Sequence, residues 1–204
     1  RFPDSSLLHE RLRSKLLWTG GPKTLEQAYT ERLASLDPSA NKGEHLTWFA
    51  GYASLVAAEH RRRRGEFEES LASYDRGIEH FERHILEHPE GRDSTDHYVA
   101  IALAGRARIL MGRGELDQAT TALAASLKRR PASAASNDGL GITPIATAKM
   151  LKAKWTEAGN EERAAGVQAA LEALDPKLLE PPPSELPGTR RRGNRGGRRG
   201  AGGR

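Results

Sequence analysis

The hydrophobic positions of this chain follow a helical period. Between residues 67 and 87, large apolar residues recur every three or four positions, at Leu71, Tyr74, Ile78, Phe81 and Ile85. This spacing places them along one stripe of an α-helix, with charged residues and histidines around the rest of the wheel. Residues 114–130 show a second helical pattern, with alanines on one side and leucines on another. The patterns predict an all-α protein without strands.

Glycine and proline divide the chain into segments of helical length. A helix is expected to end at a glycine or at the residue before a proline, because neither position favours continued helical geometry. Ser94 or Thr95 is expected to cap one helix, and Thr143 and Pro144 to begin another as N-cap and first residue. The segments pair into four antiparallel hairpins, at about residues 5–37, 44–88, 95–131 and 143–175.

The hairpins repeat along the sequence. The glycines expected between paired helices, spaced 44, 49 and 45 residues apart, are Gly21, Gly65, Gly114 and Gly159. The prolines expected to close the units are Pro38, Pro89, Pro131 and Pro176, and in three units the glycine-to-proline distance is 17 residues. Repeated helical hairpins are typical of an α-solenoid, since one hairpin cannot bury its apolar face until a neighbour stacks on it.

The third unit, about residues 98–131, resembles a tetratricopeptide repeat (TPR). Its large positions are Leu103, Leu110, Leu116, Leu123 and Leu127, its small ones are Ala107, Ala119 and Ser126, and Gly114 and Pro131 stand at the turn and the end. Small residues on facing helices let the helix axes approach to about 8–10 Å. Arg106 departs from the pattern, and the other three units match it only in part.

The resemblance implies a fold and a mode of action. It implies that residues 1–178 form four stacked hairpins in a right-handed superhelix, whose first helices line a concave groove for a peptide or a partner's helix. The function expected is therefore noncatalytic protein–protein interaction. Polar or aromatic positions on the first helices are the groove candidates: Tyr52, Glu59, Asp96, Arg106, Lys149 and Lys152.

The positive charge of the chain lies at its C-terminus. The 204 residues carry a net charge of +5, whereas residues 184–204 carry +6 and so leave −1 for the rest. Residues 179–204, Pro-rich and then Arg/Gly-rich, are expected to be disordered because they cannot bury enough apolar surface. This tail predicts two alternatives, RNA binding or a nonspecific polyanion-binding or solubilising extension, and its candidate residues are Arg190, Arg191, Arg192, Arg195, Arg198 and Arg199.

Catalytic chemistry has no support in the sequence. The chain has no cysteine and no phosphate loop, dinucleotide fingerprint or nucleophile elbow, so neither enzymatic activity nor a cofactor is expected. His80, His84 and His88 stand one helical turn apart and form a minority metal candidate. They wind around the polar side of the helix at 67–87, which favours a solvent-exposed face over a metal site.

Two runs of basic residues and three tryptophans are better explained by the fold than by ligand binding. The runs at 61–64 and 128–130 stand at helix ends, where cations stabilise the last carbonyl groups and pair with nearby acids. Intramolecular pairing is therefore favoured over a nucleic-acid patch. Trp18, Trp48 and Trp155 are expected in the core or the groove because they are large and scarce.

No window of the sequence is apolar for long enough to span a membrane, and no signal peptide is evident. A cytoplasmic location is therefore expected, although the chain begins at Arg1 without an initiator Met, so that a targeting segment could precede it. The same observation leaves a third functional alternative open. The chain would then be the helical regulatory portion of a longer enzyme or membrane-attached protein.

Overall fold

The computed structural model describes residues 5–36, 45–136 and 139–179 of the chain. Within these ranges it contains seven α-helices, three short 3-10 helices and no strand, so the all-α prediction is confirmed. The α-helices are α1 (Ser6–Ala34), α2 (Leu46–Arg63), α3 (Phe67–Glu87), α4 (Arg92–Gly112), α5 (Leu116–Arg129), α6 (Pro144–Glu157) and α7 (Glu161–Glu172). The 3-10 helices are η1 (Pro89–Gly91), η2 (Pro131–Ser133) and η3 (Pro176–Leu179).

α1 comprises two helical halves that meet at a sharp kink at Gly21, where the sequence predicts the turn of the first hairpin. Gly21 alone leaves the helical conformation, with φ 73° and ψ −169°, and Pro22 follows it directly. Proline lacks an N–H and needs no acceptor at the start of the second half of α1. The other three turn glycines named above also have positive φ, which a residue with a side chain adopts only with strain.

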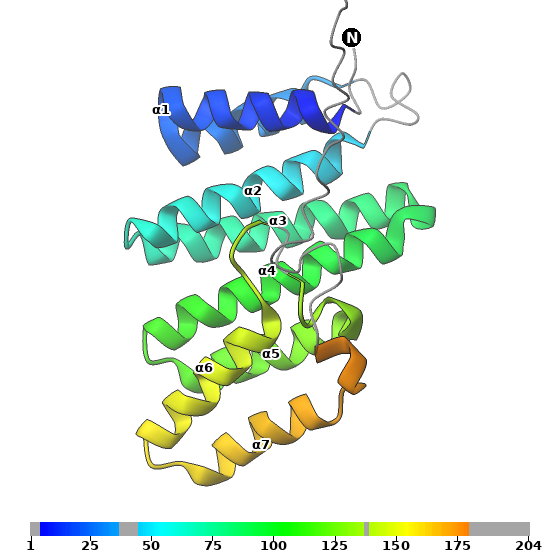
Figure 1. Ribbon diagram of the computed structural model, residues 1–204. Helices are drawn as coiled ribbons and strands as arrows, with labels where there is room; N and C mark the ends of the chain where they lie inside the picture. Colours follow the sequence, from blue (N-terminus) through cyan, green and yellow to red (C-terminus); the bar gives the residue numbers. More distant parts are fainter. Residues whose placement is uncertain (1–4, 37–44, 137–138, 180–204) are drawn as a thin grey trace, which may run out of the picture.

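The helices stack in the order of the sequence. Figure 1 shows the helices arranged in a stack, from α1 at one end to α7 at the other. Each helix packs on the next, and α4 also contacts both α2 and α6. The first helices of the last three hairpins therefore lie in contact along one side, and the molecule has a helical, repeat-like fold.

Glycines allow the closest helix contacts. A Cβ atom at Gly51 of α2 would lie 2.7 Å from the Phe81 ring of α3. A Cβ atom at Gly105 of α4 would overlap the phenol ring of Tyr74, also on α3. Phe81 and Tyr74 are fully buried at these crossings, so the glycines leave space for large rings between the backbones.

A buried carboxylate joins the first three helices. Glu26 of α1 contacts the guanidinium group of Arg61 on α2. The Oε1 atom of Glu26 also lies 2.8 Å from Nη2 of Arg76 on α3. Arg61 also donates to the hydroxyl group of Ser73. Such a cluster is costly to disrupt, because removing one partner leaves a buried charge without compensation.

The connection between α5 and α6 is anchored on the helices. Ile145 N donates to Ala134 O at 2.9 Å, which ties the two ends of the connection together. Within it, Leu140 and Ile142 are buried in the core cluster that includes Leu55 and Val99, and Arg108 of α4 donates to Gly141 O at 2.8 Å. Figure 1 shows this part of the chain crossing the stack before it enters α6.

Two sequence predictions about local structure are wrong. The fourth helix begins at Arg92, so Ser94 and Thr95 lie inside its first turn, and Thr95 donates to Gly91 O instead of capping the helix. Trp18 is 92% exposed, whereas Trp155 is buried and Trp48 is half-buried. The predicted tail at 179–204 lies outside the described residues from position 180 onward.

Candidate functional site

The first half of α1, α2 and the connection at 139–140 line an open pocket of about 260 Å³. We call it the inner pocket. Its lining residues are Glu10, Arg13, Ser14, Leu17, Tyr52, Val56, Glu59, His60, Arg63, Gly139 and Leu140. The pocket combines charged groups at its wall with the aliphatic side chains of Leu17, Val56 and Leu140. This combination can bind a peptide that has both polar and apolar groups.

Arg13 and Arg63 are the two arginines that line the inner pocket, and Arg13 has the more specific contacts. Its guanidinium group lies over the ring of Tyr52, 4.6 Å from the ring centre, in a cation–π contact. Its Nη1 atom is buried and finds no hydrogen-bond acceptor among the described residues. A buried donor without an acceptor costs about 1–3 kcal/mol, so an acceptor supplied by a bound partner would be favourable here.

His9 and Tyr29 connect the two halves of α1. His9 Nδ1 and the Tyr29 hydroxyl group lie 2.8 Å apart, and the His9 ring stacks on Phe49 of α2 with 3.7 Å between ring centres. Burial raises the pKa of Tyr29, although the Arg13 guanidinium partly opposes this by favouring the phenolate. These contacts fix the position of Arg13 relative to α2.

Tyr52 belongs to an aromatic cluster that continues into the core. Its ring stacks on the Trp48 ring, with 5.6 Å between the ring centres. It meets the Tyr98 ring of α4 edge-on, with 5.5 Å between the ring centres. The Trp48 ring also lies edge-on to the Phe81 ring of α3, with 6.3 Å between the ring centres. The rings join three helices, so the aromatic side of the inner pocket is rigid.

Glu59 lines the inner pocket but is already well bonded. Tyr74 donates its hydroxyl proton to Glu59 Oε1 at 2.5 Å, and Arg62 Nε donates to both carboxylate oxygens at 3.1 and 3.0 Å. Burial and the negative charge of Glu59 raise the pKa of Tyr74 well above its ordinary value. Glu59 therefore serves mainly to compensate buried polar groups.

The predicted groove residues have different local contacts. Tyr52 and Glu59 share the inner pocket. Each of three others contacts the helix beside its own: Asp96 binds Arg129, Arg106 Nε lies 3.0 Å from Asp75, and Lys152 donates to Gln168 at 3.1 Å. Lys149 is exposed on α6. Sequence reasoning missed Arg13, because no local pattern indicates that the first half of α1 lies beside Tyr52.

Both basic runs pair mainly within the molecule, as predicted. Arg61 binds Glu26, Arg62 binds Glu59, and Arg64 Nε lies 2.7 Å from Glu66 Oε1. In the second run, Arg129 binds Glu82 and Asp96, and Arg130 binds Asp93. Arg130 also lowers the pKa of the Asp93 carboxyl group by hydrogen bonding.

The histidines of α3 do not share one environment. His84 is only 3% exposed, so the predicted solvent-exposed face is wrong at this position. One ring nitrogen each from His45, His84 and His88 lies within 4.8 Å of the others. His80, the remaining member of the predicted metal set, is not part of this group; burial and the nearby Arg83 lower its pKa.

The predicted nucleic-acid residues, Arg190 to Arg199, lie outside the described part of the chain. Among the helices that the structure describes, none is both long enough and apolar enough to cross a membrane. Comparisons of the chain with protein-family models, with curated proteins and with solved structures find no match.

Proposed function

We propose that this protein is a noncatalytic protein–protein interaction module, a TPR-like right-handed stack of hairpins that binds a peptide or a partner's helix at the inner pocket. The observation that carries the proposal is the buried Nη1 atom of Arg13, which has no acceptor among the described residues. The Arg13 side chain lines the pocket. A turn of the side chain toward a carboxylate or backbone carbonyl of the partner would satisfy this donor, and a charge-assisted bond to a carboxylate is the stronger of the two.

The connection between α5 and α6 supports the same proposal. Arg108 donates to the backbone carbonyl of Gly141 while Leu140 inserts its side chain among core residues. A short stretch of chain thus binds the helices through one guanidinium group and one apolar anchor. The inner pocket, bordered by Leu140 and Arg13, offers the same two kinds of contact to a peptide from another protein.

Selection of peptides on the full chain tests the proposal. A random peptide library displayed on phage is selected on the wild-type protein, and the affinities of the selected peptides are measured by calorimetry. We expect acidic peptides with an apolar residue, and at least about a tenfold loss of affinity in Arg13→Ala, since charge-assisted hydrogen bonds contribute about 1.5–3 kcal/mol.

Arg11→Ala is the matched control, because Arg11 is an exposed arginine on the same helix that does not line the pocket. Thermal unfolding of both variants shows whether the fold is intact. Equal affinity of the peptides for the wild type and for folded Arg13→Ala would contradict binding at the inner pocket. Failure to select any peptide would contradict the proposal as a whole.

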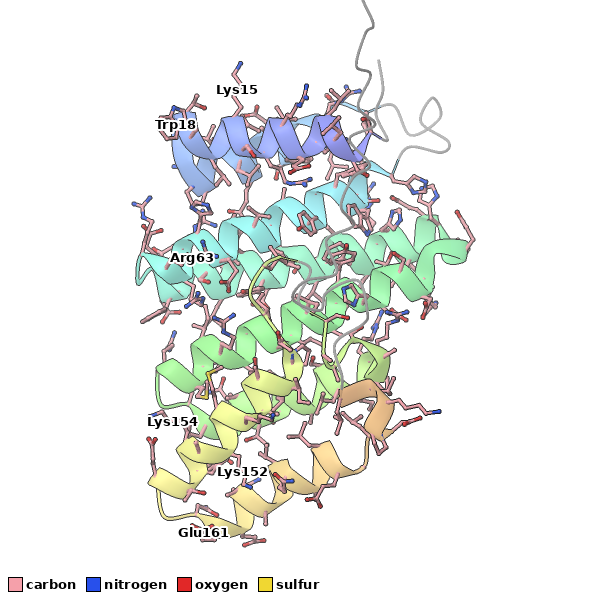
Figure 2. All side chains as sticks on the ribbon, viewed as in Figure 1. Lys15, Trp18, Arg63, Lys152, Lys154 and Glu161 are labelled. Carbon is pink, nitrogen blue, oxygen red and sulfur yellow. The ribbon has the colours of Figure 1, made fainter. Side chains whose placement is uncertain are left out.

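A second candidate function is the helical regulatory portion of a longer enzyme or membrane-attached protein. The outer face of α1 supports it, since this face exposes large hydrophobic side chains: Leu7, Leu8, Leu12 and Trp18. Figure 2 shows Trp18 and Lys15 at the end of the stack, on the side of α1 away from α2. A terminal repeat that stands alone usually has a polar outer face. The coding sequence beyond the ends of this chain tests the candidate, which requires an enzyme domain or a membrane segment there.

A further inference from the structure

Three histidines converge where α2 begins and α3 ends. His45 directly precedes α2, His84 lies in the last turn of α3, and His88 stands between α3 and η1. The ring centres of His45 and His88 are 4.5 Å apart, and those of His84 and His88 are 4.8 Å apart. The histidines come from two segments about forty residues apart in sequence, so only the folded chain brings them together.

The hydrogen bonds of Thr47 define the tautomer of His84. Thr47 Oγ1 lies 2.9 Å from Glu87 Oε2 and also 2.9 Å from His84 Nδ1. The threonine hydroxyl group has a single proton, and the ionised carboxylate can only accept, so this proton goes to Glu87. His84 must then donate its Nδ1 proton to Thr47. In the neutral imidazole, which is the form that binds metals, the Nε2 atom of His84 then has its lone pair available.

A histidine held in this way is typical of metal sites. Metal-binding histidines usually donate their second ring nitrogen to an oxygen atom that is itself hydrogen-bonded, which orients the ring and fixes the tautomer. The chain from His84 through Thr47 to Glu87 continues to Arg83, whose Nε atom lies 2.6 Å from Glu87 Oε1. His88 has a comparable neighbour, because its Nδ1 atom lies 3.4 Å from Glu90 Oε1.

Two carboxylates lie beside the histidines. Glu87 Oε2 accepts the hydroxyl proton of Thr47, which contacts His84, and Glu90 Oε1 lies 3.4 Å from His88 Nδ1. Carboxylates that orient histidine rings are common around bound metal ions, and their negative charge favours a divalent cation.

We propose that His45, His84 and His88 form a binding site for a divalent transition-metal ion of the zinc class. A tetrahedral zinc ion with Zn–N bonds of about 2.0–2.1 Å holds its nitrogen ligands about 3.3 Å apart. The three nitrogens lie within 4.8 Å, so shifts of about 1 Å bring them to this spacing. The fourth position belongs to water or to a group from a partner. The ion connects the start of α2 to the end of α3, and the site is independent of the inner pocket.

Calorimetric titration of the full chain with zinc, after treatment with a chelator, tests the proposal. We expect one zinc ion per chain and a rise in the thermal unfolding temperature, because a ligand that binds only the folded state stabilises it. His45→Gln and His88→Gln are the decisive variants, and each should weaken zinc binding by at least about tenfold. Calcium should not bind, since it requires oxygen ligands.

His80→Gln is the matched control, because it removes a histidine from the same helix outside the cluster. It should retain wild-type affinity for zinc. The His84→Gln variant is less informative, since His84 is buried and bonded to Thr47, so far-ultraviolet circular dichroism must accompany every variant. The proposal is overturned if the wild-type chain does not bind zinc. It is also overturned if His80→Gln weakens binding as much as His45→Gln and His88→Gln do.

Discussion

At the scale of single residues, the most informative groups are buried polar ones with specific partners. Tyr74 is fully buried between α2 and α4, with its ring at Gly105 and its hydroxyl group on Glu59. The helical period of the sequence does not predict these contacts, because it shows Tyr74 only as one more apolar position of the helix at 67–87. The hydrogen bond gives the buried phenol a measurable signature in the pH dependence of stability.

We expect the free energy of unfolding to fall as the pH rises above about 10, the ordinary pKa of tyrosine. The folded state raises the pKa of Tyr74, so the stabilisation is complete below this pH and is lost as the pH approaches the folded pKa. In Tyr74→Phe this alkaline loss should be smaller, with a remainder from Tyr29, whose pKa is also raised. Urea unfolding of the wild type and the variant at several pH values from 8 to 11 measures this alkaline loss of stability. An unchanged pH dependence in the variant would show that Tyr74 ionises as readily in the folded chain as in the unfolded one.

At the scale of elements, the connection between α5 and α6 behaves as part of the core rather than as a linker. Its sequence is rich in serine and glycine, which indicates a loop. However, Ile142 is fully buried, and Leu140 is buried beside it. Two apolar residues that alternate with glycines are too short a signal to predict this docking from the sequence. The connection therefore contributes to the stability of α2 and α4 as well as to the wall of the inner pocket.

We expect Ile142→Ala to lower the free energy of unfolding by about 2–5 kcal/mol, as for other fully buried aliphatic residues. Leu86→Ala is the control, because Leu86 is 81% exposed, and its effect should stay within about 0.5 kcal/mol. Equilibrium unfolding in urea measures both changes. Similar small effects for the two variants would mean that the connection does not pack on the helices in solution.

At the scale of the whole molecule, the charges are divided between a nearly neutral body and a basic tail. The two basic runs of the body pair mainly with acids of the same molecule. Residues 184–204 carry a net charge of +6, and seven arginines supply it. The RNA-binding alternative therefore depends on this tail alone, and it can be tested separately from peptide binding at the inner pocket.

If the tail binds RNA, deletion of residues 184–204 should abolish salt-sensitive binding to single-stranded RNA. Seven phosphate contacts correspond to a slope of log K against log salt of about −5 in the full chain, at about −0.7 per contact. Arg63→Gln, which removes an exposed arginine of the body, should leave this slope unchanged. Fluorescence anisotropy with labelled RNA at several salt concentrations measures it. Binding that survives the deletion, or is absent in the full chain, contradicts the alternative.

The sequence by itself determined the helical class, the positions of the helices and the turns between the hairpins. These features depend on local backbone preferences and on the spacing of apolar residues, which nearby positions reveal. The four turn glycines are the clearest case, since all have the positive φ that their place in the repeat requires. The basic runs were also interpretable, because helix ends and acidic neighbours can be identified within a few residues.

Only the tertiary structure decided which side chains meet across helices. His45 joins His84 and His88 while His80 does not, and Arg13 lies over Tyr52, because the stacking of the hairpins sets these distances. The same stacking pairs Asp96, Arg106 and Lys152 with neighbouring helices. A helical period predicts which face of a helix a residue occupies, but the neighbour that this face contacts depends on packing between segments far apart in the sequence.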